Sequence, residues 1–236
     1  MPEKTDKRYA PLYSVSEVAR YLKLPETTLR YWVKGRGRAK PVITAPAKNP
    51  YRLLSFINLV EAHVLFSITR GRKMNLREVR NALDYIAQTM AVDSSHPLAQ
   101  LKLFTDGRSV IVDHFGNLVN ATRRGQYEME KIIEVYLDRV VFDDQELPLD
   151  LYPFSHKVTN KKIALHEQLR DQPRLVRINP NISFGRPILV GTGIPTIIIF
   201  NRFESGETLT GLAEDYGRNV DEIGAAILYE TTKRAA

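Results

Sequence analysis

The segment YSVSEVARYLKLPETTLRYWVKGRGRAK, residues 13–40, reads as two short helices joined by a tight turn and followed by a basic, glycine-punctuated loop. Ser14, with Glu17 three residues later, is the capping-box pattern that opens a helix. Apolar residues then recur at helical spacing and predict one buried side: Val15, Val18, Ala19 and Leu22. After the turn, Pro25 suits the first position of a second helix, because that position does not need an N–H group. The segment therefore predicts a helix-turn-helix.

The second helix, predicted over residues 26–33, has an apolar and a polar side. Leu29, Trp32 and Val33 are expected to face inward. A short polar helix with hydroxyls and an arginine near its start fits the major groove of DNA, where side chains hydrogen-bond to base edges. We predict that four residues of the polar side face base edges: Thr27, Thr28, Arg30 and Tyr31.

Positive charge is concentrated in the same third of the chain. Residues 1–90 hold 17 basic and 7 acidic residues, a net charge of +10, whereas residues 91–172 carry −3 and residues 173–236 carry zero. Such a localised excess favours a polyanionic partner. We predict phosphate contacts from five basic residues: Lys34, Arg36, Arg38, Lys40 and Arg52. The alternative interpretation is a solvated charged face on an ordinary helical pair.

Composition excludes several classes of protein. The chain has 236 residues and no cysteine, which excludes disulfides, thiol catalysis and cysteine-ligated zinc. No apolar run approaches the roughly 20 residues of a membrane helix, and the N-terminus is charged, so we expect a cytoplasmic protein without a membrane partner.

No catalytic, metal or cofactor site is predicted. The five histidines lack metal-ligand spacing, and the glycines at 185, 191 and 193 are expected in turns with positive φ rather than in a nucleotide loop. The acids Asp143, Asp144 and Asp150 are interpreted as a solvated loop. We expect a protein that is not an enzyme.

The whole chain predicts a mainly α fold with small β elements (α+β). We divide it into a helix-turn-helix DNA-binding domain (1–90, with helices at 56–70 and after Asn75), a small α+β middle region with linker (91–172) and a C-terminal domain (173–236). The middle region is expected to contain a hairpin at 101–112, a helix at 126–137, a strand at 140–142 and a polar link at 157–171. The C-terminal domain is expected to contain a hairpin at 183–195 and helices at 196–204, 209–216 and 220–233. One apolar stripe reads as core or as a dimer seam: Leu76, Val79, Leu83, Ile86 and Met90.

Two stretches carry a family resemblance. The segment YSVSEVARYLKLPETTLRYWV and its continuation to residue 86 resemble a MerR-like helix-turn-helix. The stretch from INPNISFGRPILVGTGIP onward is similar to the DUF433 domain, whose hairpin pattern falls on these residues: Gly185, Arg186, Pro187, Gly191, Thr192, Ile194 and Pro195. Together they resemble the VapB45-like antitoxins over nearly the full length.

The resemblance implies an antitoxin that binds operator DNA, represses its own operon and neutralises a PIN-domain ribonuclease toxin. It does not assign the toxin-binding residues, although four basic side chains were considered: Arg186, Arg202, Lys233 and Arg234. We expect a homodimer on double-stranded operator DNA, with recognition helices about 34 Å apart. The alternative is a MerR-like regulator that senses a small molecule through residues 91–172.

Overall fold

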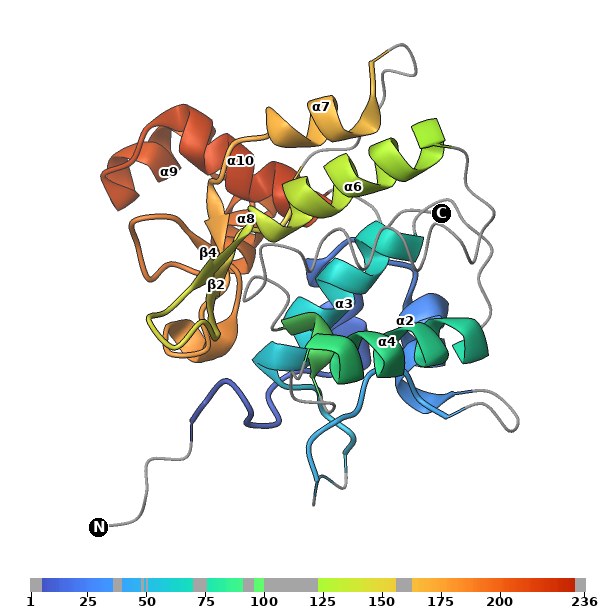
Figure 1. Ribbon diagram of the computed structural model, residues 1–236. Coiled ribbons are helices and arrows are strands. Elements are labelled where there is room, and N and C mark those ends of the chain that lie inside the picture. The colour runs from blue at the N-terminus through green and yellow to red at the C-terminus, as the bar shows by residue number, and fades with distance from the viewer. Residues whose placement is uncertain are drawn as a thin grey trace.

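The computed structural model describes residues 6–35, 40–47, 49, 51–69, 76–90, 96–99, 123–155 and 163–231. Figure 1 shows the C-terminal helices on one side of the molecule and the N-terminal helices on the other, with β2 between them. The predicted hairpin at 101–112 and the capping residue Asn75 lie outside the described residues. Among the described residues, no helix is long and apolar enough to span a bilayer.

The N-terminal part consists of four helices: α1 (Val15–Tyr21), α2 (Glu26–Lys34), α3 (Phe56–Thr69) and α4 (Leu76–Met90). The predicted capping box is present, because the Ser14 hydroxyl accepts from the Glu17 N–H while the Glu17 carboxylate accepts from the Ser14 N–H. Helix α3 is buried on almost every side and forms the centre of the larger hydrophobic core. In α4, Val79 and Leu83 belong to that core, as the core interpretation of the stripe predicted.

Two details of this part differ from the prediction. Pro25 is the N-cap of α2 in extended conformation rather than its first helical residue. Its carbonyl accepts hydrogen bonds from the N–H groups of Thr28 and Leu29, so Pro25 supplies the acceptor for the first turn of α2 without being helical itself. Val42 and Ile43 form no strand, because both N–H groups donate to the Trp32 carbonyl, at 2.8 and 3.1 Å.

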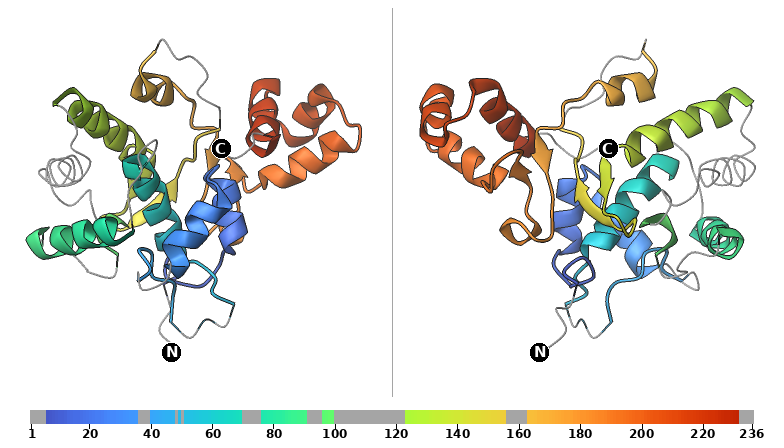
Figure 2. Two further views of the ribbon diagram at one scale, coloured as in Figure 1. Left: turned by 90° about the vertical axis from the view of Figure 1, so that its right-hand side faces the viewer. Right: turned by 60° about the vertical axis from the view of Figure 1, so that its left-hand side comes forward.

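The middle part consists of helix α6 (Arg123–Leu137), strands β1 (Val140–Phe142) and β2 (Pro148–Leu151), and helix α7 (Leu165–Arg170). Strands β1 and β2 are antiparallel, with Val140 opposite Leu151. Helix α6 packs against α3 (Figure 2), and apolar residues of α6, β1 and β2 share one core with the helix-turn-helix. The helix and strand predicted at 126–137 and 140–142 are therefore present, the helix beginning three residues earlier.

The link predicted at 157–171 is wrong in its second half, which is helix α7. The buried side chain of Arg139 explains this difference. Its guanidinium donates to the backbone carbonyls of Leu169 (3.1 Å), Pro173 (3.3 Å) and Gln172, and so satisfies the C-terminal end of α7. Burial lowers the pKa of Arg139 to about 10. This long-range cap cannot be read from the local sequence of α7.

The C-terminal part contains strand β3 (Val176–Arg177), the 3₁₀ turn η2 (Ser183–Gly185), strand β4 (Ile188–Leu189) and helices α8 (Thr196–Glu204), α9 (Leu209–Tyr216) and α10 (Val220–Thr231). Strands β3 and β4 pair antiparallel, and the three helices enclose a second hydrophobic core. Gly185 and Gly191 have φ of 72° and 75°, as the turn interpretation predicted, but the prediction is wrong for Gly193, which does not have positive φ. Gly217 ends α9 with a φ of 60°.

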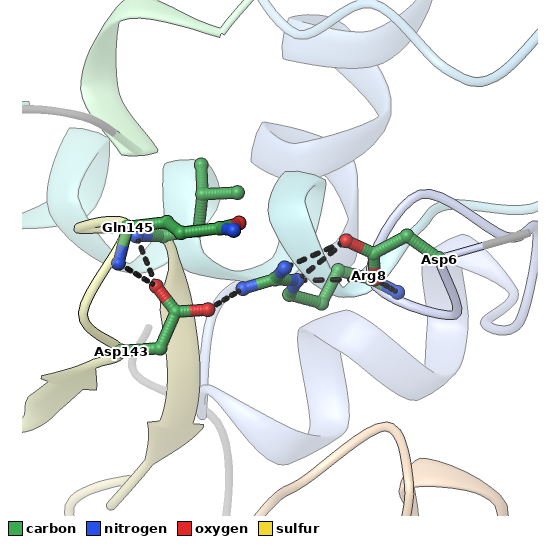
Figure 3. Close-up of polar contacts among 5 residues, drawn as sticks. Asp6, Arg8, Asp143 and Gln145 are labelled. Atoms are coloured by element: carbon green, nitrogen blue, oxygen red, sulfur yellow. Dashed lines mark hydrogen bonds and ion pairs between the residues drawn. The ribbon is translucent and has the colours of Figure 1, made fainter.

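Two contacts tie the middle part to its neighbours. Leu151 and Ile178 exchange backbone hydrogen bonds of 3.0 and 2.8 Å, which join β2 to the C-terminal part. At the other end, the Arg8 guanidinium lies between the carboxylates of Asp6 and Asp143 (Figure 3). Asp143 also accepts from the N–H of Gln145 at 3.0 Å, so the N-terminal segment is bonded to the β1–β2 turn.

Candidate nucleic-acid interface

Helix α2 has one buried and one exposed side. Leu29, Trp32 and Val33 are 0%, 4% and 8% exposed and pack into the larger core. Thr27, Arg30 and Lys34 lie on the other side and are exposed, as expected from the spacing. The C-terminal end of α2 is held because the Trp32 carbonyl receives the two returning N–H groups of Val42 and Ile43, while Gly35, with φ of 72°, ends the helix. A rigid helix with a free polar side is what groove reading requires.

The guanidinium of Arg30 is already paired. It bonds to the carboxylate of Glu26, one turn earlier on α2, and about half of the Arg30 side chain remains exposed. Arginine can donate two parallel hydrogen bonds to guanine O6 and N7. Glu26 accepts one N–H of the guanidinium and so competes with a base edge for it, while the remaining N–H groups can still donate.

The other two residues predicted to face base edges are less accessible. Thr28 is half-buried, and its N–H belongs to the first turn of α2. Tyr31 is half-buried and packs against the larger core. The geometry therefore leaves Thr27 and Arg30 as the most exposed members of the predicted base-reading set.

Three of the predicted phosphate-contacting residues, Lys34, Lys40 and Arg52, are exposed. Arg36 and Arg38 lie outside the described residues. Arg52 sits in a turn with φ of 50°, closed by Asn49, whose carbonyl accepts from the Arg52 N–H at 3.1 Å. The same turn exposes 83% of Tyr51. The Asn-Pro pair at 49–50 was the available signal for a turn here.

Two basic residues of the helix-turn-helix are engaged elsewhere. Arg20 forms a 2.8 Å ion pair with Glu230, and the Lys23 ammonium donates to the Tyr229 carbonyl. Both partners lie on α10 of the C-terminal part. The basic excess of residues 1–90 is therefore divided between the exposed side of α2 and a contact inside the molecule.

The described residues contain no group of three or more histidine or acidic side chains arranged to hold a metal. The acids interpreted as a solvated loop are instead used in structure. Asp143 is paired with Arg8, while Asp150 is buried and accepts from the Asn179 amide at 2.7 Å. That interpretation was wrong for these two residues, because their partners are distant in sequence.

Two family models match parts of the chain. Residues 11–83 match a family model described as a putative DNA-binding HTH domain, and residues 176–229 match the DUF433 family of unknown function. The putative antitoxin VapB45 of Mycobacterium tuberculosis is 27% identical over 92% of this chain and 92% of its own length. The predicted resemblance to VapB45-like antitoxins is confirmed.

A further relative and a solved structure, both from Mycobacterium tuberculosis, are also similar. The uncharacterized protein Rv2308 is 24% identical over 95% of this chain and 92% of its own length. The crystal structure of Rv2018 superposes with a TM-score of 0.67 at 25% identity, covering 92% of this chain and 98% of the other. The similarity to VapB45 and the fold therefore extend over all three parts of the chain, including the middle part that neither family model matches.

Proposed function

We propose that the protein is a DNA-binding antitoxin that represses its own operon and neutralises a PIN-type ribonuclease toxin. The observation that carries the DNA-binding half is the exposed side of α2, where Thr27, Arg30 and Lys34 lie opposite a fully packed apolar side. The match to the HTH family model and the similarity to VapB45 support it. In this proposal the chain acts in the cytoplasm by binding, without catalysis or a cofactor.

On the operator, the exposed end of α2 enters the major groove. Thr27 and Arg30 read base edges there, and Thr28 and Tyr31 contribute at the margin. Five basic residues contact the phosphates: Lys34, Arg36, Arg38, Lys40 and Arg52. A homodimer places two such helices about 34 Å apart on a two-fold symmetric site.

The toxin-binding half of the proposal rests on the similarity to VapB45. Of the four basic side chains considered from the sequence, Arg186 is exposed, whereas Arg202 is held by Glu207 and Asp215. The other two, Lys233 and Arg234, lie outside the described residues.

The test of DNA binding uses the full chain and the duplex upstream of its own reading frame. Fluorescence anisotropy at several salt concentrations should give tighter binding to this duplex than to a scrambled duplex of the same composition. Equal affinity for the two duplexes would contradict a specific repressor.

The toxin-binding half is tested separately, by co-expression with the product of the adjacent reading frame. A stoichiometric complex in which ribonuclease activity is suppressed supports an antitoxin. Ribonuclease activity that is unaffected by an excess of the purified chain would overturn it.

A further inference from the structure

The turn between α1 and α2 contains a residue in an unfavourable backbone conformation. Lys23 has φ of 57°, in the left-handed region that glycine normally occupies at a helix end. Helix α1 ends in the corresponding motif, because the Leu24 N–H reaches back to the Ala19 carbonyl at 2.9 Å. A lysine in this position needs additional contacts to hold it there.

Those contacts come from the last helix of the chain. The Lys23 ammonium donates to the Tyr229 carbonyl and lies 4.0 Å from the centre of the Tyr229 ring. The Tyr229 hydroxyl in turn donates to the Tyr21 carbonyl at 2.9 Å, at the C-terminal end of α1. Tyr229 is fully buried, so its ring and hydroxyl serve this contact and do not face solvent.

A charge pair reinforces the same junction. Arg20 on α1 forms a 2.8 Å ion pair with Glu230, whose side chain is only 3% exposed. Glu230 also accepts from the Thr196 hydroxyl at 2.5 Å, at the start of α8. The end of α10 is thereby fixed to its own domain and to α1 at once.

We propose that Tyr229 and Glu230 are positioning residues for DNA recognition, acting from the C-terminal domain through Lys23 and Arg20. They hold the end of α1 and the following turn, and so fix the angle at which α2 meets the groove. This inference rests on the DNA-binding half of the proposed function. The competing explanation is that Lys23 and Arg20 are themselves phosphate contacts.

Two variants separate these explanations. Tyr229→Phe keeps the ring but removes the hydrogen bond to α1, at a buried site that DNA does not reach. Lys23→Met removes the ammonium and keeps the length of the side chain. The control is Lys131→Met, which removes the same charge from a half-buried residue of α6 that pairs with Glu134.

Each variant is measured on two duplexes. The first is selected from a randomised pool by its binding to the wild-type protein, and the second has a random sequence. The readout is the affinity for each duplex. We expect Tyr229→Phe and Lys23→Met to reduce the ratio of the two affinities by roughly fivefold, with Lys131→Met unchanged. The dependence of affinity on salt should stay the same for Tyr229→Phe, because no phosphate contact is lost. If Lys23→Met weakens both duplexes equally and lowers the salt slope by about 1, while Tyr229→Phe has no effect, Lys23 is a phosphate contact and the proposal is overturned.

A second measurement, amide hydrogen exchange, does not depend on DNA. Amide hydrogen exchange across residues 24–34 should be faster in Tyr229→Phe and Lys23→Met than in the wild type, and unchanged exchange would contradict positioning. If the wild type fails to discriminate between duplexes, the proposed function fails while this exchange still tests the junction.

Lys23→Gly suits the left-handed turn, so it should fold at least as stably as Lys23→Met yet keep the reduced affinity ratio. A normal ratio in Lys23→Gly would count against the proposal.

Discussion

Arg30 and Glu26 form an ion pair one turn apart on the exposed side of α2. The pair holds the arginine side chain along the helix and at the same time neutralises its charge. The Glu26 carboxylate competes with a phosphate or base for Arg30, and its negative charge itself repels DNA. We therefore regard Glu26 as an attenuator of DNA affinity rather than as a contact.

Glu26→Gln should tighten binding to every duplex by about twofold to fivefold, because an exposed ion pair of this kind contributes roughly 0.2–1 kcal/mol. Anisotropy titrations at fixed salt would measure the change. Glu214→Gln, which removes an exposed acid from α9, is the control for net charge. Equal gains in the two variants would mean that overall charge, and not release of Arg30, is responsible.

Arg30→Ala and Lys34→Ala should weaken DNA binding in different ways. If Arg30 reads a guanine, its loss should cost about 1–3 kcal/mol and relax the preference at one base pair. Loss of Lys34 should weaken all duplexes alike and reduce the salt slope by about 1. Binding titrations on single-base variants of the selected duplex would separate the two, and an unchanged base preference in Arg30→Ala would remove Arg30 from the reading set.

Elements whose signals are local were predicted well from the sequence. The capping pair Ser14–Glu17 is formed, and the helices at 196–204 and 209–216 have the predicted bounds. In each case a few neighbouring residues satisfy the end of the helix, so the pattern and the structure carry the same information.

The features that the sequence did not predict depend on contacts between residues that are distant in sequence. Arg139 caps α7 across about thirty residues, Arg8 reaches Asp143 across 135, and Arg20 reaches Glu230 across 210. Sequence spacing cannot pair such residues, so the sequence interpretation places Asp143 in a solvated loop and includes Arg8 and Arg20 in the basic excess of residues 1–90. The half-buried state of Tyr31 has the same origin, since the surface that covers it comes from other parts of the core.

His63 should make stability depend on pH. The ring is fully buried on α3 and lies 3.0 Å from the Tyr136 carbonyl, and burial lowers its pKa to about 4. In the unfolded chain a histidine titrates near 6.5, so between these values the unfolded state binds the proton and the folded state does not. This contribution to stability is therefore complete above pH of about 6.5 and is lost as pH falls toward 4.

The expected loss from His63 is at most about 3 kcal/mol over that window. Urea unfolding of the wild type and His63→Gln at pH 7.5 and 4.5 would measure it, because glutamine does not titrate. Glu61, whose pKa is raised by burial, acts in the opposite sense but is common to both proteins and cancels in the difference. The same pH dependence in both proteins would rule out His63 as its source.

Two glycines of the C-terminal domain should respond to alanine with opposite signs. Gly217 ends α9 with φ of 60°, a conformation that a Cβ atom disfavours although nothing lies within 4 Å of it. Gly217→Ala should therefore destabilise the protein by about 1 kcal/mol, and Gly217→Asn by less.

Gly224 lies within α10 with open space around its Cβ position, so Gly224→Ala should stabilise by about 0.5–1 kcal/mol. Urea unfolding at neutral pH measures both changes. Destabilisation by Gly224→Ala would indicate that the surface of α10 beside Gly224 is covered by a second chain, because added volume is unfavourable only where a neighbour is packed against it.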